Sequence, residues 1–558
     1  MKFKYQLSPL FKSLVLLIII TACQDKTQKA DLIITNTTIW TGNDDQPWAE
    51  AMAISGDSIL SVGSTEEISR FIGENTLTRD LSGRFITPGF IDSHVHLLRG
   101  GFNLNSVQLR YAKTPDEFIK AIGAYAKTLP KGSWILGGDW DHENWGGELP
   151  TKSWIDSVTK DNPVFITRLD GHMSLANSIA LELAGVSNDA NDIEGGEIVR
   201  NDKGEITGLF KDNASSLIWS AVTDPTTEEY ENALNAAMKY LASNGVTSVH
   251  HMSAAGHYNV LKKVRSEGNL ITRIYAMYPL NQWEDLKQEI DTNGKGDYWL
   301  KIGGLKGFVD GSLGSHTAAF FNAYTDNPSD SGFFVAPIDS IYKHVKAADN
   351  AGLQVMIHAI GDKAIHSLLN TFETVEKENG DKDRRFRIEH AQHIDPNDIK
   401  RFSELNVIPS MQPYHAIDDG RWAEKLIGSE RIKTTYAFKA LLDANAQLAF
   451  GSDWFVAPPT PLMGIYAAVT RRTLDDQNPD GWVPEQKISV EQALNAYTNT
   501  AAYASFDEEI KGSLAPGKLA DFVIISDNLT TVDPVSIKDL KILETYVGGK
   551  RVFGDGDN

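Results

Sequence analysis

Two histidines separated by one residue follow an apolar run near the start of the chain. His94 and His96 end the segment 90–96, directly after a turn at residues 87–89. Residues i and i+2 of a strand share a face, so both imidazoles are expected to point the same way. Paired neutral imidazoles suit zinc or a similar divalent ion. The alternative is a pair of exposed histidines at a strand end.

A carboxylate and two more histidines occupy similar positions. Asp453 ends the apolar run 448–453, where it could touch a metal ion and take a proton from the attacking water. Its alternative is to cap the next helix. His358 and His390 also end apolar runs. Alone, either could be a hydrogen-bonded structural histidine, but beside the first two motifs both are predicted metal ligands.

These side chains need a scaffold that gathers strand ends in one place. Between residues 86 and 507, apolar runs alternate with amphipathic helical stretches, which predicts βα units and a parallel sheet. We expect an α/β fold, a (β/α)8 barrel of the TIM type, whose sites lie at the C-terminal strand ends. The expected strands end near His96, His251, Met277, Asp310, His358, His390, Gln412 and Asp453.

The rest of the mature chain divides between a small second domain and an insertion. Residues 31–85 and 508–554 hold short apolar runs between turns, and neither is large enough for a core of its own. We expect both ends to join into one β-sandwich. Residues 99–245, approximately, do not follow the repeat and include Trp134, Trp140, Trp145 and Trp154. They are expected to form an inserted, lid-like subdomain.

The N-terminus has the pattern of a bacterial lipoprotein signal. Lysines flank an apolar run at residues 14–20, which small residues separate from Cys23. The run is far shorter than the ~20 residues of a membrane span. We interpret residues 1–22 as a signal peptide, Cys23 as the lipidation site and 23–30 as a linker. A plain secretory signal is the alternative.

Composition narrows the chemistry further. Cys23 is the one cysteine in the chain, so a metal site must use histidine, carboxylate or a modified lysine. The formal net charge of -21 argues against nucleic acid as a partner, because phosphate binding needs a basic surface. A small-molecule substrate is expected instead. The oligomeric state is left open, a homodimer included.

The motifs, taken in order, resemble the amidohydrolase superfamily and its amidohydrolase-3 branch, which includes N-substituted formamide deformylases. The likeness covers residues 31–554 and is carried by the segments 83–96, 170–172, 306–314, 358–362, 389–392 and 512–521. It implies one or two divalent ions, zinc expected, held by His94, His96, Lys306, His358, His390 and Asp453. His172, Asp310 and the tryptophan-rich insertion are candidates for substrate contact, with packing and turn capping as their alternatives. His316 stands where the branch would have arginine.

The resemblance implies hydrolysis of a non-peptide carbon–nitrogen bond in an amide, N-formyl compound or cyclic amide. A divalent metal lowers the pKa of water to about 7. Asp453 would take the proton and pass it to the leaving nitrogen. Lys306 is expected to carry a carbamate, formed with carbon dioxide, that bridges two ions. A lysine paired with Asp310 or another acid is the alternative.

Two rival functions remain at this point. One is hydrolytic deamination of an aromatic amine on the same scaffold, which would use one metal ion and leave Lys306 structural. The other is a periplasmic binding lipoprotein that keeps the barrel without turnover. The complete set of six candidate ligands argues against the second.

The lipoprotein interpretation can be tested by changing one residue. The variant Cys23→Ser should turn a membrane-associated protein into a soluble or unprocessed one, because the acyl anchor is lost. Gln24 after the cysteine, in place of aspartate, favours the outer membrane and its periplasmic face. Fractionation of cells that express each form measures this. A wild-type protein found entirely in the soluble fraction contradicts the anchor.

Overall fold

The computed structural model describes residue 1 and residues 28–252 and 256–554. The signal peptide and Cys23 therefore lie outside the described residues. Within the described part of the chain, no helix is long and apolar enough to cross a membrane.

A barrel of eight parallel strands forms the centre of the molecule, as expected. The strands follow one another in chain order: β8 Phe90–Val95, β15 Val246–His251, β16 Arg273–Pro279, β17 Leu300–Phe308, β18 Gln354–Ala359, β19 Arg387–His390, β20 Ile408–Met411 and β21 Ala449–Phe450. A parallel bridge between Val95 and Trp454 joins the last strand segment to the first. The TIM-type barrel is thereby confirmed.

Helices between the strands cover the outside of the barrel. They are α3 Leu97–Asn103, α8 Thr227–Ser243, α9 Tyr258–Ser266, α10 Trp283–Asn293, α11 Ile338–Asn350, α12 Asp362–Asn379, α13 Ile399–Glu404, α16 Phe438–Asp443, α17 Pro461–Thr470, α18 Val490–Ala496 and α19 Asn499–Tyr503. In α12 the buried residues Ile365, Leu368 and Phe372 recur at helical spacing and face the sheet. Since side chains fill the interior as well, strands such as β18 are buried along both faces.

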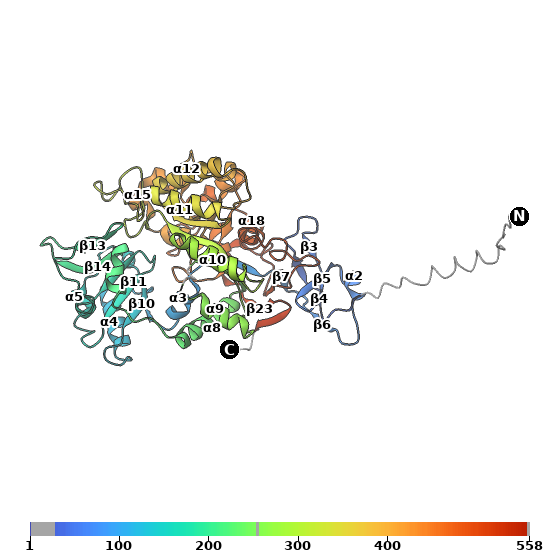
Figure 1. Ribbon diagram of the computed structural model, residues 1–558. Helices are drawn as coiled ribbons and strands as arrows, with labels where there is room; N and C mark the ends of the chain where they lie inside the picture. The colour runs from blue at the N-terminus through green and yellow to red at the C-terminus, as the bar shows by residue number, and fades with distance from the viewer. Residues whose placement is uncertain (2–27, 253–255, 555–558) are drawn as a thin grey trace.

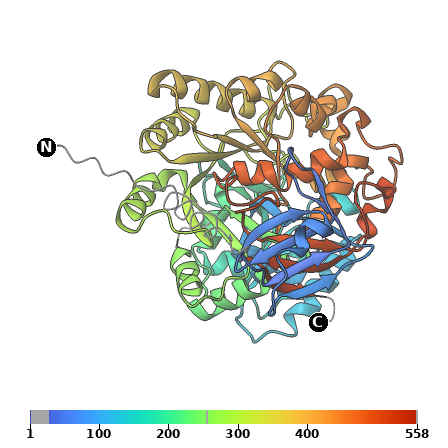
Figure 2. The same ribbon diagram turned by 90° about the vertical axis from the view of Figure 1, so that its right-hand side faces the viewer.

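The two chain ends share a pair of sheets beside the barrel. One sheet has β5 Ser58–Gly63, β4 Ala51–Ser55, β1 Leu32–Thr35 and β6 Leu77–Asp80; the other has β24 Lys550–Gly554, β23 Ile542–Val547, β22 Phe522–Ile525, β7 Phe85–Pro88, β2 Thr38–Trp40 and β3 Trp48–Ala49. Strand β7 pairs with β22, so N- and C-terminal strands lie side by side (Figure 2). Arg273 at the start of β16 forms a buried ion pair with Asp521, which fastens these sheets to the barrel.

An inserted subdomain lies on the opposite side of the barrel from these sheets (Figure 1). Its sheet contains β13 Gly196–Arg200, β14 Ile206–Asp212, β12 Met173–Ala176, β11 Val164–Arg168, β10 Ile135–Trp140 and β9 Val107–Gln108, with helices α4 Pro115–Ala126, α5 Lys152–Ile155, α6 Ser178–Leu183 and α7 Ser216–Trp219. It is shorter than the expected 99–245. Helix α8 buries Leu234, Met238 and Leu241 in the barrel core, so α8 is a barrel helix.

The tryptophans of the insertion fill its core. Trp140, Trp145 and Trp154 surround the buried ring of Phe118, and Trp140 is fully buried. Trp134 packs against a second small apolar cluster. These four rings therefore serve the core of the insertion, whereas Trp219 is exposed and lines a hollow beside the barrel, so the insertion remains a candidate for substrate contact.

Candidate functional site

Six side chains from five strand ends meet at the mouth of the barrel. His94 and His96 come from the end of β8, Lys306 from β17, His358 from β18, His390 from β19, and Asp453 follows β21. Asp453 Oδ1 lies 3.3 Å from His94 Nε2 and 3.2 Å from His96 Nε2. Lys306 Nζ lies 3.2 Å from His94 Nε2. We call these six residues the ligand cluster; the structure brings together every ligand that the sequence predicted.

The histidines of the cluster are held through their outer ring nitrogens. His94 Nδ1 pairs with Glu389 Oε2 at 2.5 Å, His390 Nδ1 with Gln412 Oε1 at 2.8 Å, and His358 Nε2 with the carbonyl of Gly311 at 3.0 Å. Because each of these partners accepts, the ring nitrogen concerned carries the proton. The other nitrogen keeps its lone pair, as a metal ligand requires.

An ion pair inside the barrel supports His94 from below. Glu389 and Arg387 are both fully buried, with Arg387 Nε 2.7 Å from Glu389 Oε1. Arg387 also donates to the carbonyl of Ser93 and to Ser410 Oγ. The carboxylate that orients His94 thus has its own charge balanced in place.

The protonation states of the cluster suit a divalent cation. Burial lowers the pKa of His94, His358 and His390 well below the ordinary value, so these rings are neutral. Burial opposes ionisation of Asp453, but His94 and His96 hold its pKa below the usual range. The donor set is therefore neutral imidazole and anionic carboxylate, which is the set that zinc takes.

Lys306 has the environment needed for a reactive amine. Burial lowers its pKa to about 8. Among the described residues, no carboxylate lies within 4.0 Å of Lys306 Nζ, so the expected alternative of a pair with Asp310 does not occur. The amine points at His94 and lies over the ring of Phe308.

Local backbone geometry turns the ligands into the barrel mouth. His390 and Asp453 have φ values of 73° and 59°, the left-handed region that non-glycine residues rarely adopt. Asp92 ties the two strand ends together, because its Oδ1 accepts from the backbone N–H groups of His94 and Ser452. At Gly451 a Cβ would lie 2.6 Å from the backbone nitrogen of His94, so a larger residue would displace the first ligand.

Asp310 supports the site without facing a substrate, which corrects the expectation that it contacts one. Its carboxylate is completely buried and accepts from the backbone N–H groups of Ala319, Ile360 and Gly361 at 2.8–3.0 Å. It connects the loop after β17 with the loop after β18, next to His358. The sequence pattern placed Asp310 at a strand end but could not show which way it points.

A pocket lies above the cluster, between the barrel and the insertion. His172 lines it, with Nδ1 2.6 Å from Asp212 Oδ1 and its ring 4.9 Å from that of His358. His172 thus remains a candidate for substrate contact. His316 is not among the residues that line the pocket; its Nε2 lies 3.1 Å from Asp326 Oδ2.

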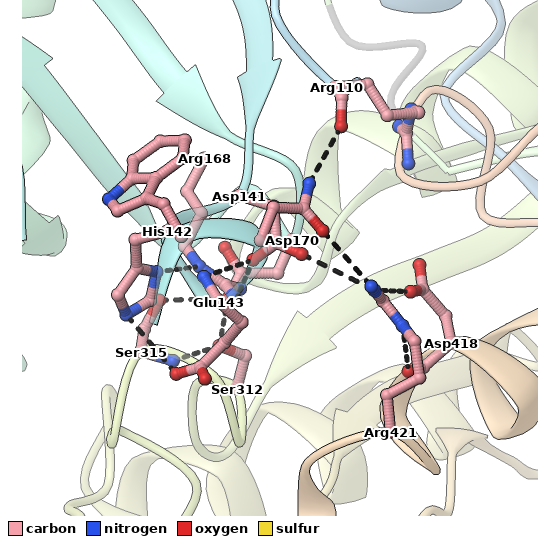
Figure 3. Close-up of polar contacts among 12 residues, drawn as sticks. Arg110, Asp141, His142, Glu143, Arg168, Asp170, Ser312, Ser315, Asp418 and Arg421 are labelled. Atoms are coloured by element: carbon pink, nitrogen blue, oxygen red, sulfur yellow. Dashed lines mark hydrogen bonds and ion pairs between the residues drawn. The ribbon is translucent and has the colours of Figure 1, made fainter. Parts of the chain in front are cut away.

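The polar walls of this pocket were missed by sequence reasoning. Its lining includes Asp141 and Asp170 of the insertion. On the barrel side, Asp418 and Asp419 lie at the end of α14 Pro413–Asp419, and Trp422 lies between this helix and α15 Ala423–Arg431. Figure 3 shows that Arg168 joins Asp141 and Asp170, while Arg421 joins Asp418 and Asp141. Among these residues, only the stretch 168–172 stands out in the sequence. The partners Asp141 and Arg421 are far apart in the chain and come together only in the folded protein.

Comparison with known proteins bears on what this geometry means. A model described as the amidohydrolase family matches residues 77–553. The chain belongs to the amidohydrolase family. The residues that match the family model run from β6 to β24 and include all six members of the ligand cluster.

Several relatives are similar along nearly their whole length. Putative amidohydrolase YtcJ of Bacillus subtilis is 31% identical, over 90% of this amidohydrolase and 96% of the relative. Protein LONG AFTER FAR-RED 3 of Arabidopsis thaliana is 43% identical, over 94% and 92%. N-substituted formamide deformylase of Arthrobacter pascens is 25% identical, over 94% and 98%. A solved structure, an uncharacterized metal-dependent hydrolase from Pyrococcus horikoshii, is 29% identical with a TM-score of 0.73, over 90% and 99%.

The supporting role of Asp310 predicts a stability defect. In Asp310→Asn, an amide N–H₂ replaces an oxygen that accepts from buried backbone N–H groups. We expect a loss of about 1–3 kcal/mol in the free energy of unfolding, measured by denaturant titration of metal-free protein. The exposed Asp443→Asn should change it by no more than about 0.5 kcal/mol. Equal stability of both variants would contradict this role.

Proposed function

We propose that this amidohydrolase cleaves a non-peptide carbon–nitrogen bond in an amide, N-formyl compound or cyclic amide. One observation carries the proposal: Asp453 Oδ1 lies between the inner nitrogens of His94 and His96, within 3.3 Å of both. A carboxylate held there can bind a cation and exchange a proton with a reacting water. The similarity to N-substituted formamide deformylase supports the choice of bond.

The ligand cluster would hold one or two divalent ions, with zinc expected from its nitrogen and oxygen donors. Such an ion would polarise the substrate carbonyl and make water nucleophilic at neutral pH. We expect His94, His96 and Asp453 to hold one ion, and His358 and His390 a second. The donor atoms of His94, His390 and Asp453 all lie within 4.8 Å of one another. Lys306 Nζ lies beside His94, 3.2 Å from Nε2.

Asp453 is the residue that moves the proton. Its pKa lies below the usual range although burial opposes ionisation, so the carboxylate is ready to accept a proton. Its buried Oδ1 has no hydrogen-bond partner among the described residues, so its lone pairs are free to bind a cation or accept a proton. After accepting the proton, the carboxyl group would give it to the departing nitrogen. His172 would orient the substrate from the wall of the pocket.

Lys306 would act as an anionic ligand once it is carbamylated. The lowered pKa makes the neutral amine accessible, and a neutral amine adds carbon dioxide to give a carbamate and a proton. The product has two oxygens that can bridge ions on either side. Its negative charge would offset the second cation.

Substitution of a metal ligand and substitution of the proton carrier should have different effects on the metal content of the enzyme. His94→Ala should lose metal and activity together, because a direct bond is removed. Asp453→Asn should keep most of the metal and lose about 10²–10⁴-fold in kcat on N-formyl amines. Metal analysis beside steady-state kinetics measures both. As a control, His366→Ala, outside the cluster, should change neither.

Three results would overturn parts of this proposal. An active Asp453→Asn enzyme would remove the proton-transfer role. Ammonia release from aromatic amines, with one metal ion per chain, would indicate the deaminase function instead. A metal-loaded enzyme that binds but does not turn over any N-acyl amine, N-formyl amine, cyclic amide or aminopurine would indicate a binding protein.

The role of Lys306 predicts a chemical rescue. Lys306→Ala should be almost inactive and should hold less metal, because the bridging anion is lost. Acetate should restore part of its activity, since a small carboxylate can take the place of the carbamate, and it should not raise wild-type activity. We also expect extra density on Lys306 Nζ and close to two metal ions in a crystal structure. A fully metal-loaded structure with unmodified Lys306 would contradict this role.

A further inference from the structure

Arg99 is a cation without an acidic partner at the edge of the ligand cluster. It lies in α3, three residues after His96, and its side chain is exposed to solvent. Its one hydrogen bond in the described part of the chain runs from Nη2 to Thr167 Oγ1, at 3.2 Å. No carboxylate of the described residues lies within 4.0 Å of the guanidinium. Most of its five N–H donors are therefore available.

The guanidinium is nevertheless held in one orientation. It stacks on Phe455 at 4.0 Å from the ring centroid, and the ring of Phe455 lies 6.0 Å from that of His96. The carbonyl of Phe455 in turn accepts from Arg110 Nη2 at 2.8 Å. Stacking and the bond to Thr167 fix the plane of Arg99 only one aromatic ring away from a candidate metal ligand.

Arg99 lines an open hollow between the barrel and the insertion. Gly171 also lines it, and the next residue, His172, lines the pocket above the cluster, so the two spaces are neighbours. The other charged residue in the hollow is Asp212, whose carboxylate is paired with His172 at 2.6 Å. Arg99 therefore contributes the one uncompensated charge among the residues that line this space.

The remaining acids near Arg99 already have partners. Asp139 pairs with Arg110 at 3.4 Å, and Asp453 faces His94 and His96. Both act on Arg99 through space without forming an ion pair with it. The position thus differs from Arg168 and Arg421, whose guanidiniums are occupied by acids of the pocket wall.

We propose that Arg99 binds a carboxylate group of the substrate, so that this amidohydrolase acts on amides that carry a carboxylate on the amine or acyl part. The inference rests on the proposed function and names its substrate class. A planar guanidinium pairs with a carboxylate through two parallel hydrogen bonds. A single free cation balances a single negative charge, whereas a doubly charged phosphate would need a second cation that the hollow does not supply.

The test compares matched substrates that differ in the carboxylate. N-formyl-ω-amino acids of increasing chain length are paired with N-formylalkylamines of the same length, and kcat/KM is measured for wild type and Arg99→Gln. For the best chain length, wild type should prefer the acid, and Arg99→Gln should reduce this preference about 10- to 100-fold, mainly through KM. The matched control is Arg265→Gln, which removes an exposed arginine already paired with Asp297 and should leave the preference unchanged.

Failure of this inference and failure of the proposed function give different results. If wild type cleaves the neutral amides and no acid is preferred, or if Arg99→Gln keeps the preference, the carboxylate site is wrong and the hydrolase stands. If neither series is cleaved, calorimetric titration with the same N-formyl acids decides. Binding that weakens about tenfold or more in Arg99→Gln supports the site, and equal binding by both proteins overturns it.

Discussion

The hydrogen bond between Glu389 and His94 is the interaction on which the site depends. Both side chains are completely buried, so the carboxylate would be costly without a counter-charge. Arg387, two residues earlier on the same strand, supplies that charge and is itself hydrogen-bonded to the carbonyl of Ser93 in β8 and to Ser410 Oγ in β20. The barrel interior therefore sets the proton position on His94. Its free nitrogen then faces both Lys306 and Asp453, which places the two remaining kinds of ligand.

A second constraint is that the ligands must turn inward where the strands stop. His390 and Asp453 adopt the left-handed backbone region at those points, and neither is glycine. The strain of about 1–3 kcal/mol per residue has to be offset by surrounding contacts. Asp92 supplies some of them by accepting from the backbone at both His94 and Ser452. The geometry of the cluster thus results from tertiary contacts that close the barrel.

The sequence predicted the barrel and the ligand cluster because both depend on local patterns. In β18, for example, an apolar run leads up to His358 near the end of the strand. Asp310 met the same description, yet its carboxylate turns toward backbone amides of later loops, which no spacing reveals. The tryptophans of the insertion show a related limit of local patterns: aromatic side chains serve a core and a binding wall equally well, and Trp140 lies in the core whereas Trp219 lines a hollow. The contact of Arg421 with Asp141 joins segments 280 residues apart, beyond any local signal.

The distribution of charge above the cluster connects fold with specificity. Asp141, Asp170 and Asp418 bring negative charge to the pocket wall, but Arg168 and Arg421 balance it through ion pairs that also tie the insertion to the barrel. These ion pairs occupy both guanidiniums, so neither arginine is free to bind an anionic ligand. Arg99 is outside this balance, since its position is fixed by an aromatic ring and a hydroxyl group, both uncharged. A cation held rigid at low cost and kept without an anion is preorganised to bind one. For this reason the recognition of the substrate's charge is assigned to the barrel helix that carries Arg99, while the insertion shapes the space around it.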